Sequence, residues 1–401
     1  MHPSPRSLWR TRDFRTLWIA HGISLLGSQV TFLALPLVAI VTLRATPFQM
    51  GLLGATGGIP ILLFGLLIGA WVDRHRRRPA LIVSDLGRAA LLLTVPLAVV
   101  AGVLHLGLLL LVAFLIGTLS LVFEVAAQAF LPTLVPRERL TEANSKLELG
   151  RSAAEIAGPG VAGGMVQLVT APFALLADAV SFVVSALLLA SIRVVEPPRP
   201  RDPDSRVREE IREGMRWVWR HPVLRPLTGA TGILAFFNSL LEAVYLLYVT
   251  RHLALAPAAL GVIFALGGVG FLLGAVGAGG VARRIGAGRT LILALALVGL
   301  GDLATPLVGG PPQLCFGAAL AAFKVITASL RQGSTPDRLQ GRMNATVRLL
   351  VEGLTPLGAL AGGVLGQGIG LRPTLLVAVG GEVLAALWLL CSSVRRVGAS
   401  A

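Results

Sequence analysis

Long apolar stretches dominate the chain, and short polar segments separate them. Two of these stretches, Met50–Val72 and Ala80–Val100, are divided by a short segment that carries four arginines and one aspartate. A helix of about 20 residues crosses the hydrocarbon layer of a bilayer, which is about 30 Å thick. No soluble core could bury two such stretches so close together. The pattern therefore predicts a hairpin of two membrane-spanning helices with its charged turn in the cytoplasm.

The same pattern extends along the whole chain and predicts twelve membrane-spanning helices. The fold class is therefore all-α, with a first set of spans at Leu17–Leu43, Gln49–Val72, Ala80–Ala101, Leu106–Phe130, Leu147–Val169 and Pro172–Ile192. The second set comprises Leu227–Thr250, Ala258–Ala282, Thr290–Val308, Gln313–Leu330, Val347–Ile369 and Pro373–Ser392.

The two sets repeat each other. An arginine-rich turn like the first one returns at Gly279–Arg289, 210 positions later. The fifth and eleventh spans share an arginine, a glutamate and a proline at intervals of four, namely Arg151, Glu155 and Pro159, and Arg348, Glu352 and Pro356. Internal repeats of this kind are typical of transporters. We expect two pseudo-symmetric six-helix bundles, at residues 1–192 and 226–401.

Residues 193–225 separate the bundles. This segment begins with several prolines, and Val207, Ile211, Met215 and Val218 then recur at helical spacing. The pattern predicts a cytoplasmic linker with an amphipathic helix at the level of the lipid headgroups. A plain solvated linker is the alternative.

Composition and charge support a membrane protein and fix its orientation. Of the 401 residues, 55% are hydrophobic and 14% charged, and the mean hydropathy is +0.79; about a quarter of a soluble domain is charged. The net charge of +15 is divided among short loops, so no nucleic acid is expected as a partner. Of 35 lysines and arginines, only Arg44, Arg251 and Arg372 fall on the face opposite the arginine-rich turns. Both termini of this multi-pass protein are therefore predicted to be cytoplasmic, with the chain in the cell membrane.

The sequence Gly69-x3-Asp73-Arg74-x-x-Arg77-Arg78 resembles the signature of the major facilitator superfamily, between its second and third helices. The resemblance implies the twelve-helix fold of that family. It also implies that Asp73, Arg74 and Arg77 tie this loop to neighbouring helix ends and hold the cytoplasmic side shut. Arg76 stands where the family usually has glycine.

A second resemblance lies in the fifth span. The segment Gly158–Gly164, with Pro159 and Gly163, is similar to the glycine–proline motif of antiporters in that family. Glycines allow helices to approach closely, and proline bends a helix. Three short segments, Ser84–Ala89, Asn144–Leu149 and Gly341–Thr346, resemble the enterobactin-exporter and macrolide-efflux branch. This branch implies export of a bulky solute.

Glu124 and Lys324 are the charged residues that we expect to couple transport to protons. They stand 200 positions apart in the fourth and tenth spans. The resemblance implies that the first, fourth, seventh and tenth spans line a central cavity. We hypothesise that the two side chains pair when the cytoplasmic side closes and separate when it opens, and that protonation of Glu124 favours opening. The alternative is that one of them reaches the interface or a structural partner.

Other ionisable residues in the spans are candidates because charge inside a bilayer is costly. The pairs Arg151–Glu155 and Arg348–Glu352 have the i,i+4 spacing of ion pairs on one helix face, and we expect structural charge pairs, with gating as the alternative. Asp178 and Asp302 lie near the outer ends and are expected to reach water. Glu382 has no partner that the sequence identifies.

Polar residues of the first, fourth, seventh and tenth spans are candidates for contacts with the transported solute: Gln29, Gln128, Asn238, Glu242 and Thr327. A large cavity with apolar walls and few polar groups suits bulky amphipathic molecules. Interhelical hydrogen bonds are the alternative role for each.

Together these observations predict a monomeric proton-coupled exporter of a drug, macrolide or siderophore-like solute. An uptake transporter of the same fold stays open, as does a non-transporting receptor. The six histidines are scattered, and no phosphate-binding Gly-x4-Gly-Lys-Ser/Thr sequence is present. We therefore expect no enzyme activity, no metal and no cofactor; the partners are the solute, protons and the lipid bilayer.

Overall fold

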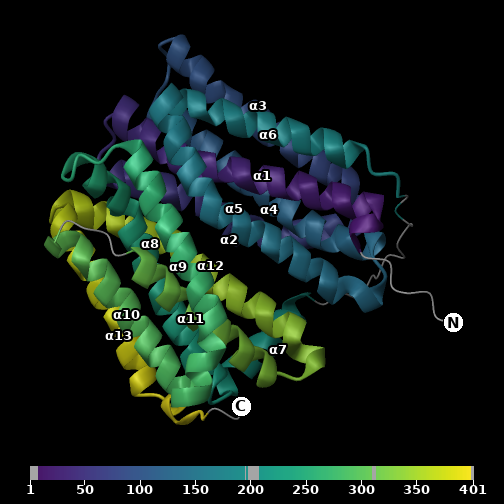
Figure 1. The fold of residues 1–401 in the computed structure, drawn as a ribbon, viewed down its shortest axis with the longest axis vertical. Helices are drawn as coiled ribbons and strands as arrows, with labels where there is room; N and C mark the ends of the chain where they lie inside the picture. Colours follow the sequence, from purple (N-terminus) through teal and green to yellow (C-terminus); the bar gives the residue numbers. More distant parts are fainter. Residues whose placement is uncertain (1–7, 195, 197–206, 309–312, 399–401) are drawn as a thin grey trace. The chain divides into compact units, whose positions relative to one another are not determined.

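The computed structural model describes residues 8–194, 196, 207–308 and 313–398, and within these residues it is helical without any β-strand (Figure 1). Eleven of the described helices are long and apolar enough to cross a membrane. The remaining predicted span, the fifth, forms the helix Leu140–Val169, whose first half carries several charged side chains. The predicted all-helical membrane fold is thus confirmed.

The chain divides into two compact units. Unit 1 comprises residues 1–44, 63–202 and 257–262, and unit 2 comprises residues 45–62, 203–256 and 263–401. The predicted boundaries at 192 and 226 stay a prediction, and the proline-rich start of the linker, residues 197–206, lies outside the described part of the chain.

Unit 1 is built on five complete helices, and the end of α2 (Pro47–Arg74) joins them. These helices are α1 (Arg12–Leu37), α3 (Arg77–Val100), α4 (Leu106–Leu134), α5 (Leu140–Val169) and α6 (Ala171–Ala190). Within this unit α6 packs against both α1 and α3, and α1 also packs against α5 (Figure 1).

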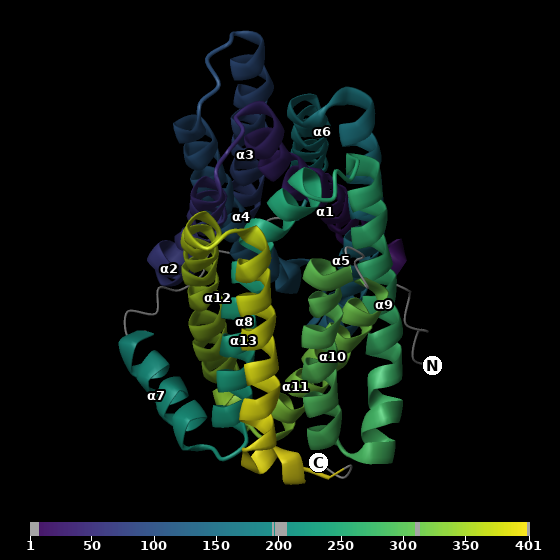
Figure 2. The same cartoon turned by 90° about the vertical axis from the view of Figure 1, so that its left-hand side faces the viewer.

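Unit 2 contains the remaining helices and the first part of α2. Its helices are α7 (Val207–Arg220), α8 (Leu224–Arg251), α9 (Pro257–Ile285, whose first residues belong to unit 1), α10 (Ala287–Val308), α11 (Gln313–Gly333), α12 (Asp337–Gly368) and α13 (Leu371–Leu390). Here α8 packs against α12 and α13, and α10 packs against α11 and α13 (Figure 2).

Many large apolar side chains lie on the surface rather than in a core. Leu168 is 85% exposed, Val276 79% and Val100 74%. A helix that is apolar on its outer face as well as on its packed face is typical of a bilayer environment. The outer surfaces of both units thus agree with insertion in lipid.

Two tight turns mark the repeat. Thr170 links α5 to α6 with φ of 68°, and Gly370 links α12 to α13 with φ of 89°. Both residues have positive φ at the same place in the two sets of helices. Glycine adopts such a conformation without strain, whereas a threonine there costs about 1–3 kcal/mol, which the surrounding packing must offset.

Helix α7 of the linker packs on the beginning of α12. Val218 of α7 is fully buried against Met343 and Val347 of α12, and the Glu213 carboxylate forms an ion pair with Arg342. Trp219, the next residue along the helix, is 57% exposed. One face of this amphipathic segment therefore covers α12, and the ring of Trp219 beside that face is presented to the surroundings.

The centre of unit 1 holds a buried cation between two carboxylates. Arg88 of α3 is 4% exposed, forms an ion pair with Asp85 of the same helix, and interacts electrostatically with Asp178 of α6. Its guanidinium carbon lies 4.6 Å from the ring centroid of Phe123 and 4.1 Å from that of Phe182. Asp178 also accepts a hydrogen bond from Thr31 of α1. Contacts around one positive charge therefore hold α1, α3, α4 and α6 together.

This arrangement predicts that the charge of Arg88 stabilises the fold. An Arg88→Leu variant leaves two carboxylates buried without their cation, and the loss of one partner of a buried pair costs about 3–5 kcal/mol. We expect a clear fall in the melting temperature of the purified protein in detergent. The same change at Arg139, whose pair with Glu142 is more exposed, serves as the control and leaves melting nearly unchanged. Equal melting temperatures of the two variants would contradict this role for Arg88.

Candidate functional site

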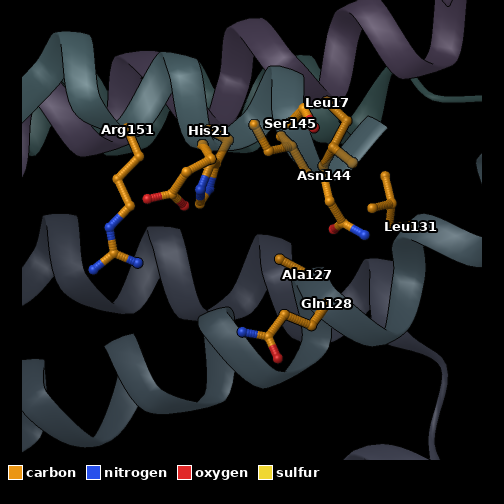
Figure 3. A pocket seen from close by; sticks show the side chains of 10 residues that line it. Leu17, His21, Ala127, Gln128, Leu131, Asn144, Ser145 and Arg151 are labelled. Carbon is orange, nitrogen blue, oxygen red and sulfur yellow. The ribbon is translucent and has the colours of Figure 1, made fainter. Parts of the chain in front are cut away.

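A pocket of about 410 Å³ opens in unit 1 among α1, α4 and α5. Its lining mixes apolar and polar groups: Leu17, His21, Ala127, Gln128, Leu131, Asn144, Ser145, Leu147, Glu148 and Arg151. Figure 3 shows Arg151 and Asn144 projecting from one side toward Gln128 on the other. The pocket is large enough for part of a drug-sized molecule and offers both ring-packing and hydrogen-bonding surfaces.

Glu124 of α4 lies beside this pocket among three basic side chains. It interacts electrostatically with His21 of α1, with Arg88 of α3 and with Arg151 of α5. The His21 ring stacks on Phe123 with 5.9 Å between centroids and 2° between planes, and its Nδ1 atom is buried without a hydrogen bond to any described residue. Glu124 therefore has one imidazole and two guanidinium groups as neighbours beside the pocket.

In unit 2, Lys324 of α11 has an acidic neighbour of its own. The carboxyl group of Glu242 on α8 interacts electrostatically with the Lys324 ammonium group. The Lys324 Nζ atom also lies 5.6 Å from the ring centroid of Phe271 on α9. Both charged side chains are exposed, whereas Thr327, one turn beyond Lys324, is buried and its hydroxyl has no described hydrogen-bond partner. Each of the two charges singled out in the sequence thus has an oppositely charged neighbour within its own unit.

The glycine–proline segment of α5 serves close helix packing at two of its positions. An ideal Cβ atom on Gly158 would collide with the side chain of Gln29 on α1. One on Gly163 would lie 2.5 Å from the carbonyl oxygen of Pro257 and 2.7 Å from Cα of Gly261 in α9. Gly164 faces open space. Gln29 therefore packs in an interhelical contact, and Gly163 allows two backbones to meet.

The charged turn between α2 and α3 is held by a residue that the sequence pattern does not single out. The Glu196 carboxylate accepts hydrogen bonds from the backbone N–H groups of Arg77 and Arg78 at 2.8 and 2.7 Å. These are the first two residues of α3, where a carboxylate interacts favourably with the helix dipole. Arg77 is buried, whereas Asp73 and Arg74 are exposed. Glu196 therefore caps the third span from the end of the first half of the chain.

The two arginine–glutamate pairs exist as hydrogen-bonded ion pairs. The Nε–Oε1 distance is 3.0 Å for Arg151–Glu155 in α5 and 2.9 Å for Arg348–Glu352 in α12. Side chains in both pairs are between 39% and 51% exposed. Their matching geometry on α5 and α12 is a further sign of the repeat.

Two acidic residues differ from the sequence-based expectation, and a third has partners that the sequence does not identify. Asp178 and Asp302 do not reach water as expected, because Asp178 is fully buried and Asp302 is only 4% exposed. Both lie where another helix packs on their own, so burial follows from packing rather than from depth along the helix. Glu382, for which the sequence identifies no partner, interacts with the side chains of Asp302 on α10 and Asn238 on α8.

His21, Asp85, Arg88 and Glu196 are charged or titratable residues that the sequence interpretation missed. Asp85 and Arg88 stand three apart within an apolar span, and this i,i+3 pairing of opposite charges is a usable signal. His21 and Glu196 have no comparable signal, because their partners come from distant parts of the chain. Among the described residues no group of histidine, cysteine and acidic side chains could hold a metal ion.

Comparisons with known proteins cover most of the chain. The chain is 28% identical to the multidrug efflux pump Tap of Mycolicibacterium fortuitum over 87% of this chain and 88% of that protein. It is 24% identical to macrolide efflux protein A of Streptococcus pyogenes over 52% and 51% of the two chains. Both relatives are named as efflux proteins.

Solved structures share the fold at lower identity. A bacterial homologue of the iron transporter ferroportin in an inward-facing state superposes with a TM-score of 0.75 at 19% identity, over 96% of this chain and 99% of that one. The nucleoside transporter NupG gives a TM-score of 0.73 at 11% identity, over 94% of this chain and 98% of that one.

The sequence-family model for the Major Facilitator Superfamily matches residues 17–354, which is most of the chain. This match agrees with the helical fold, with the repeat of α5 in α12 and with the charged turn between α2 and α3. The chain therefore belongs to the major facilitator superfamily and is a multi-pass membrane transporter rather than an enzyme.

Proposed function

We propose that this protein exports a bulky amphipathic solute in exchange for protons by alternating access. The observation that carries the proposal is the pocket of about 410 Å³ in unit 1, which combines apolar walls with Gln128, Asn144 and Arg151. The named function of the efflux relatives supports export. Drugs, macrolides and siderophore-like molecules share the required mixture of large apolar surface and a few polar groups.

In this proposal the protein works as a monomer with both termini in the cytoplasm. Its two six-helix bundles, residues 1–192 and 226–401, move against each other about a central cleft. Gln29, Asn238 and Thr327 contribute to the cleft or to the helix contacts beside it. The arginine excess of the loops supports this orientation.

Proton coupling is assigned to Glu124 and Lys324. Glu124 has basic neighbours in unit 1, and Lys324 has Glu242 in unit 2. We propose that the two charges exchange these neighbours for each other when the cytoplasmic side closes. Protonation of Glu124 removes its negative charge and so weakens this pairing, which favours opening toward the cytoplasm. Asp73, Arg74 and Arg77 complete the cytoplasmic gate.

Export is tested first by the direction of transport. Inside-out vesicles with an acidic interior are expected to accumulate the exported solute, and collapse of the gradient is expected to abolish accumulation. A drug-susceptibility panel in a pump-deficient host selects the solute for this assay. Accumulation only in right-side-out vesicles would show the uptake transporter, and binding without transport in either orientation would show the receptor.

Glu124→Gln and Lys324→Met are each expected to lower proton-driven transport about tenfold or more, a loss that corresponds to about 1.4 kcal/mol. The reason is that each removes one half of the proposed pair. The charge swap Glu124→Lys with Lys324→Glu is expected to recover part of the activity. Glu138→Gln, in the exposed turn before α5, is the matched control. Unchanged proton-dependent efflux in both single variants would remove these residues from the coupling mechanism.

The motif in α5 predicts a contrast between adjacent glycines. Gly163→Ala forces two backbones apart, and overpacking of this kind costs about 1–3 kcal/mol. We expect slower transport and a lower melting temperature. Gly164→Ala adds the same methyl group in open space and is expected to behave like the wild type. If the two variants transport equally fast, the close approach of α5 and α9 is not required for function.

A further inference from the structure

A second buried acidic site lies in unit 2, between α10 and α13. Asp302 of α10 is 4% exposed and Glu382 of α13 is fully buried. The two carboxyl groups interact with each other, and Glu382 also interacts with Asn238 of α8. The helices are closely packed here, because an ideal Cβ atom on Gly299 of α10 would lie 2.9 Å from a methyl carbon of Val383. The pair is therefore enclosed by three helices.

None of the basic side chains described in unit 2 neutralises this pair. The other charged group that acts on both acids is Glu242 of α8, which is itself negative. Lys324 of α11 interacts with Glu242, and Arg331 of α11 donates a hydrogen bond to Thr231 at 2.8 Å. Arg372 lies in the first turn of α13, ten positions before Glu382, a separation of about 15 Å along a helix.

The oxygens of the pair are also poorly satisfied. Neither Glu382 oxygen, nor Oδ2 of Asp302, makes a hydrogen bond of regular geometry to a described residue. The hydroxyl of Thr305, one turn after Asp302, is buried and likewise has no described partner. A buried carboxylate without donors is costly, whereas a protonated carboxyl group can donate a hydrogen bond to its neighbour.

In unit 1 a buried cation neutralises the corresponding pair of acids. Its acids Asp85 and Asp178 lie on α3 and α6, which are the helices that correspond to α10 and α13 in the repeat. There Arg88 forms an ion pair with Asp85 and interacts with Asp178. Unit 2 has two acids between the matching helices but no arginine beside them among the residues described there.

We infer that Asp302 and Glu382 hold one proton between them and exchange it with water through Glu242. Two carboxylates in contact cannot both be ionised in a buried site, as in dyads that share a proton. Glu242 is exposed and interacts with both acids, so it offers a route by which one proton enters or leaves. The exchange breaks one O–H bond and forms another, and no other covalent bond changes.

The role in transport of the proton shared by Asp302 and Glu382 depends on the proposed proton-coupled function. Loss of the proton would raise the uncompensated charge between α10 and α13 from one negative charge to two, which favours any rearrangement that brings water or a cation to it. The presence of the proton, however, does not depend on transport. The two claims can therefore be tested separately.

The proton itself is tested by infrared spectroscopy of the purified full-length protein in detergent at neutral pH, without solute. We expect a carbonyl band of protonated carboxyl groups that is lost in the Asp302→Asn/Glu382→Gln double variant, which keeps the shape and hydrogen-bonding capacity of both side chains. Glu155→Gln, in an exposed ion pair, is the control and keeps the band. Absence of the band in the wild type, or its persistence in the double variant, overturns the inference. So does a carboxylate band that shifts on addition of Na⁺, which would indicate a cation site.

The coupling role is tested with Asp302→Asn alone in proteoliposomes. We expect solute movement down its own gradient to continue while accumulation against a gradient falls about tenfold or more, or about 1.4 kcal/mol. If the wild type shows the infrared band but Asp302→Asn still accumulates solute against a gradient, the shared proton is not part of the transport cycle. Where the wild type shows no proton-driven transport at all, the proposed function fails while the infrared result for the proton stands.

Discussion

The cost of placing charge inside a bilayer constrains the whole of this structure. A single ionisable side chain at the centre of a membrane helix costs about 2.5–3.5 kcal/mol on insertion scales. The chain nevertheless carries acids in both units at buried or half-buried positions, among them Asp178 and Glu382. Each has to be neutralised by a neighbour or by a proton. In unit 1 the buried cation of Arg88 performs this task, with two aromatic rings on its guanidinium group.

This constraint gives the proposed function its physical basis. A charge that is held by a neighbour can change partners when helices move, and a charge held by a proton can release it. Glu124 lies among His21, Arg88 and Arg151, so its protonation alters the charge balance beside the pocket. Glu124 and these basic side chains therefore lie next to the pocket, and exchange of a solute for protons requires such a neighbourhood.

Much of the fold follows from the sequence alone because long apolar stretches and arginine-rich turns are strong, local signals. The helices, the repeat of the Arg151–Glu155 pair in Arg348–Glu352, and the family were all predictable in this way. The burial of Asp302 was not, because depth along a helix does not reveal which face a second helix covers. Partners such as Glu196 for α3 were also hidden, since they depend on contacts between residues more than a hundred positions apart.

The candidate site was predictable only in part. The acid at 124 and the base at 324 stand out because charge is rare in the spans, but the role of His21 depends on its stacking against Phe123, which no spacing in the sequence indicates. The sequence also does not indicate that Arg88 neutralises the buried acids of unit 1, whereas no described basic side chain neutralises those of unit 2. This difference becomes visible only when α3 is seen packed on α6 and α10 on α13.

The most direct test of proton-coupled transport is to count the protons that the purified protein exchanges with lightly buffered detergent solution when an exported solute is added. We expect net proton release that saturates together with solute binding and that falls in Glu124→Gln. Saturable solute binding without any proton release, over the pH range in which transport occurs, would contradict the mechanism.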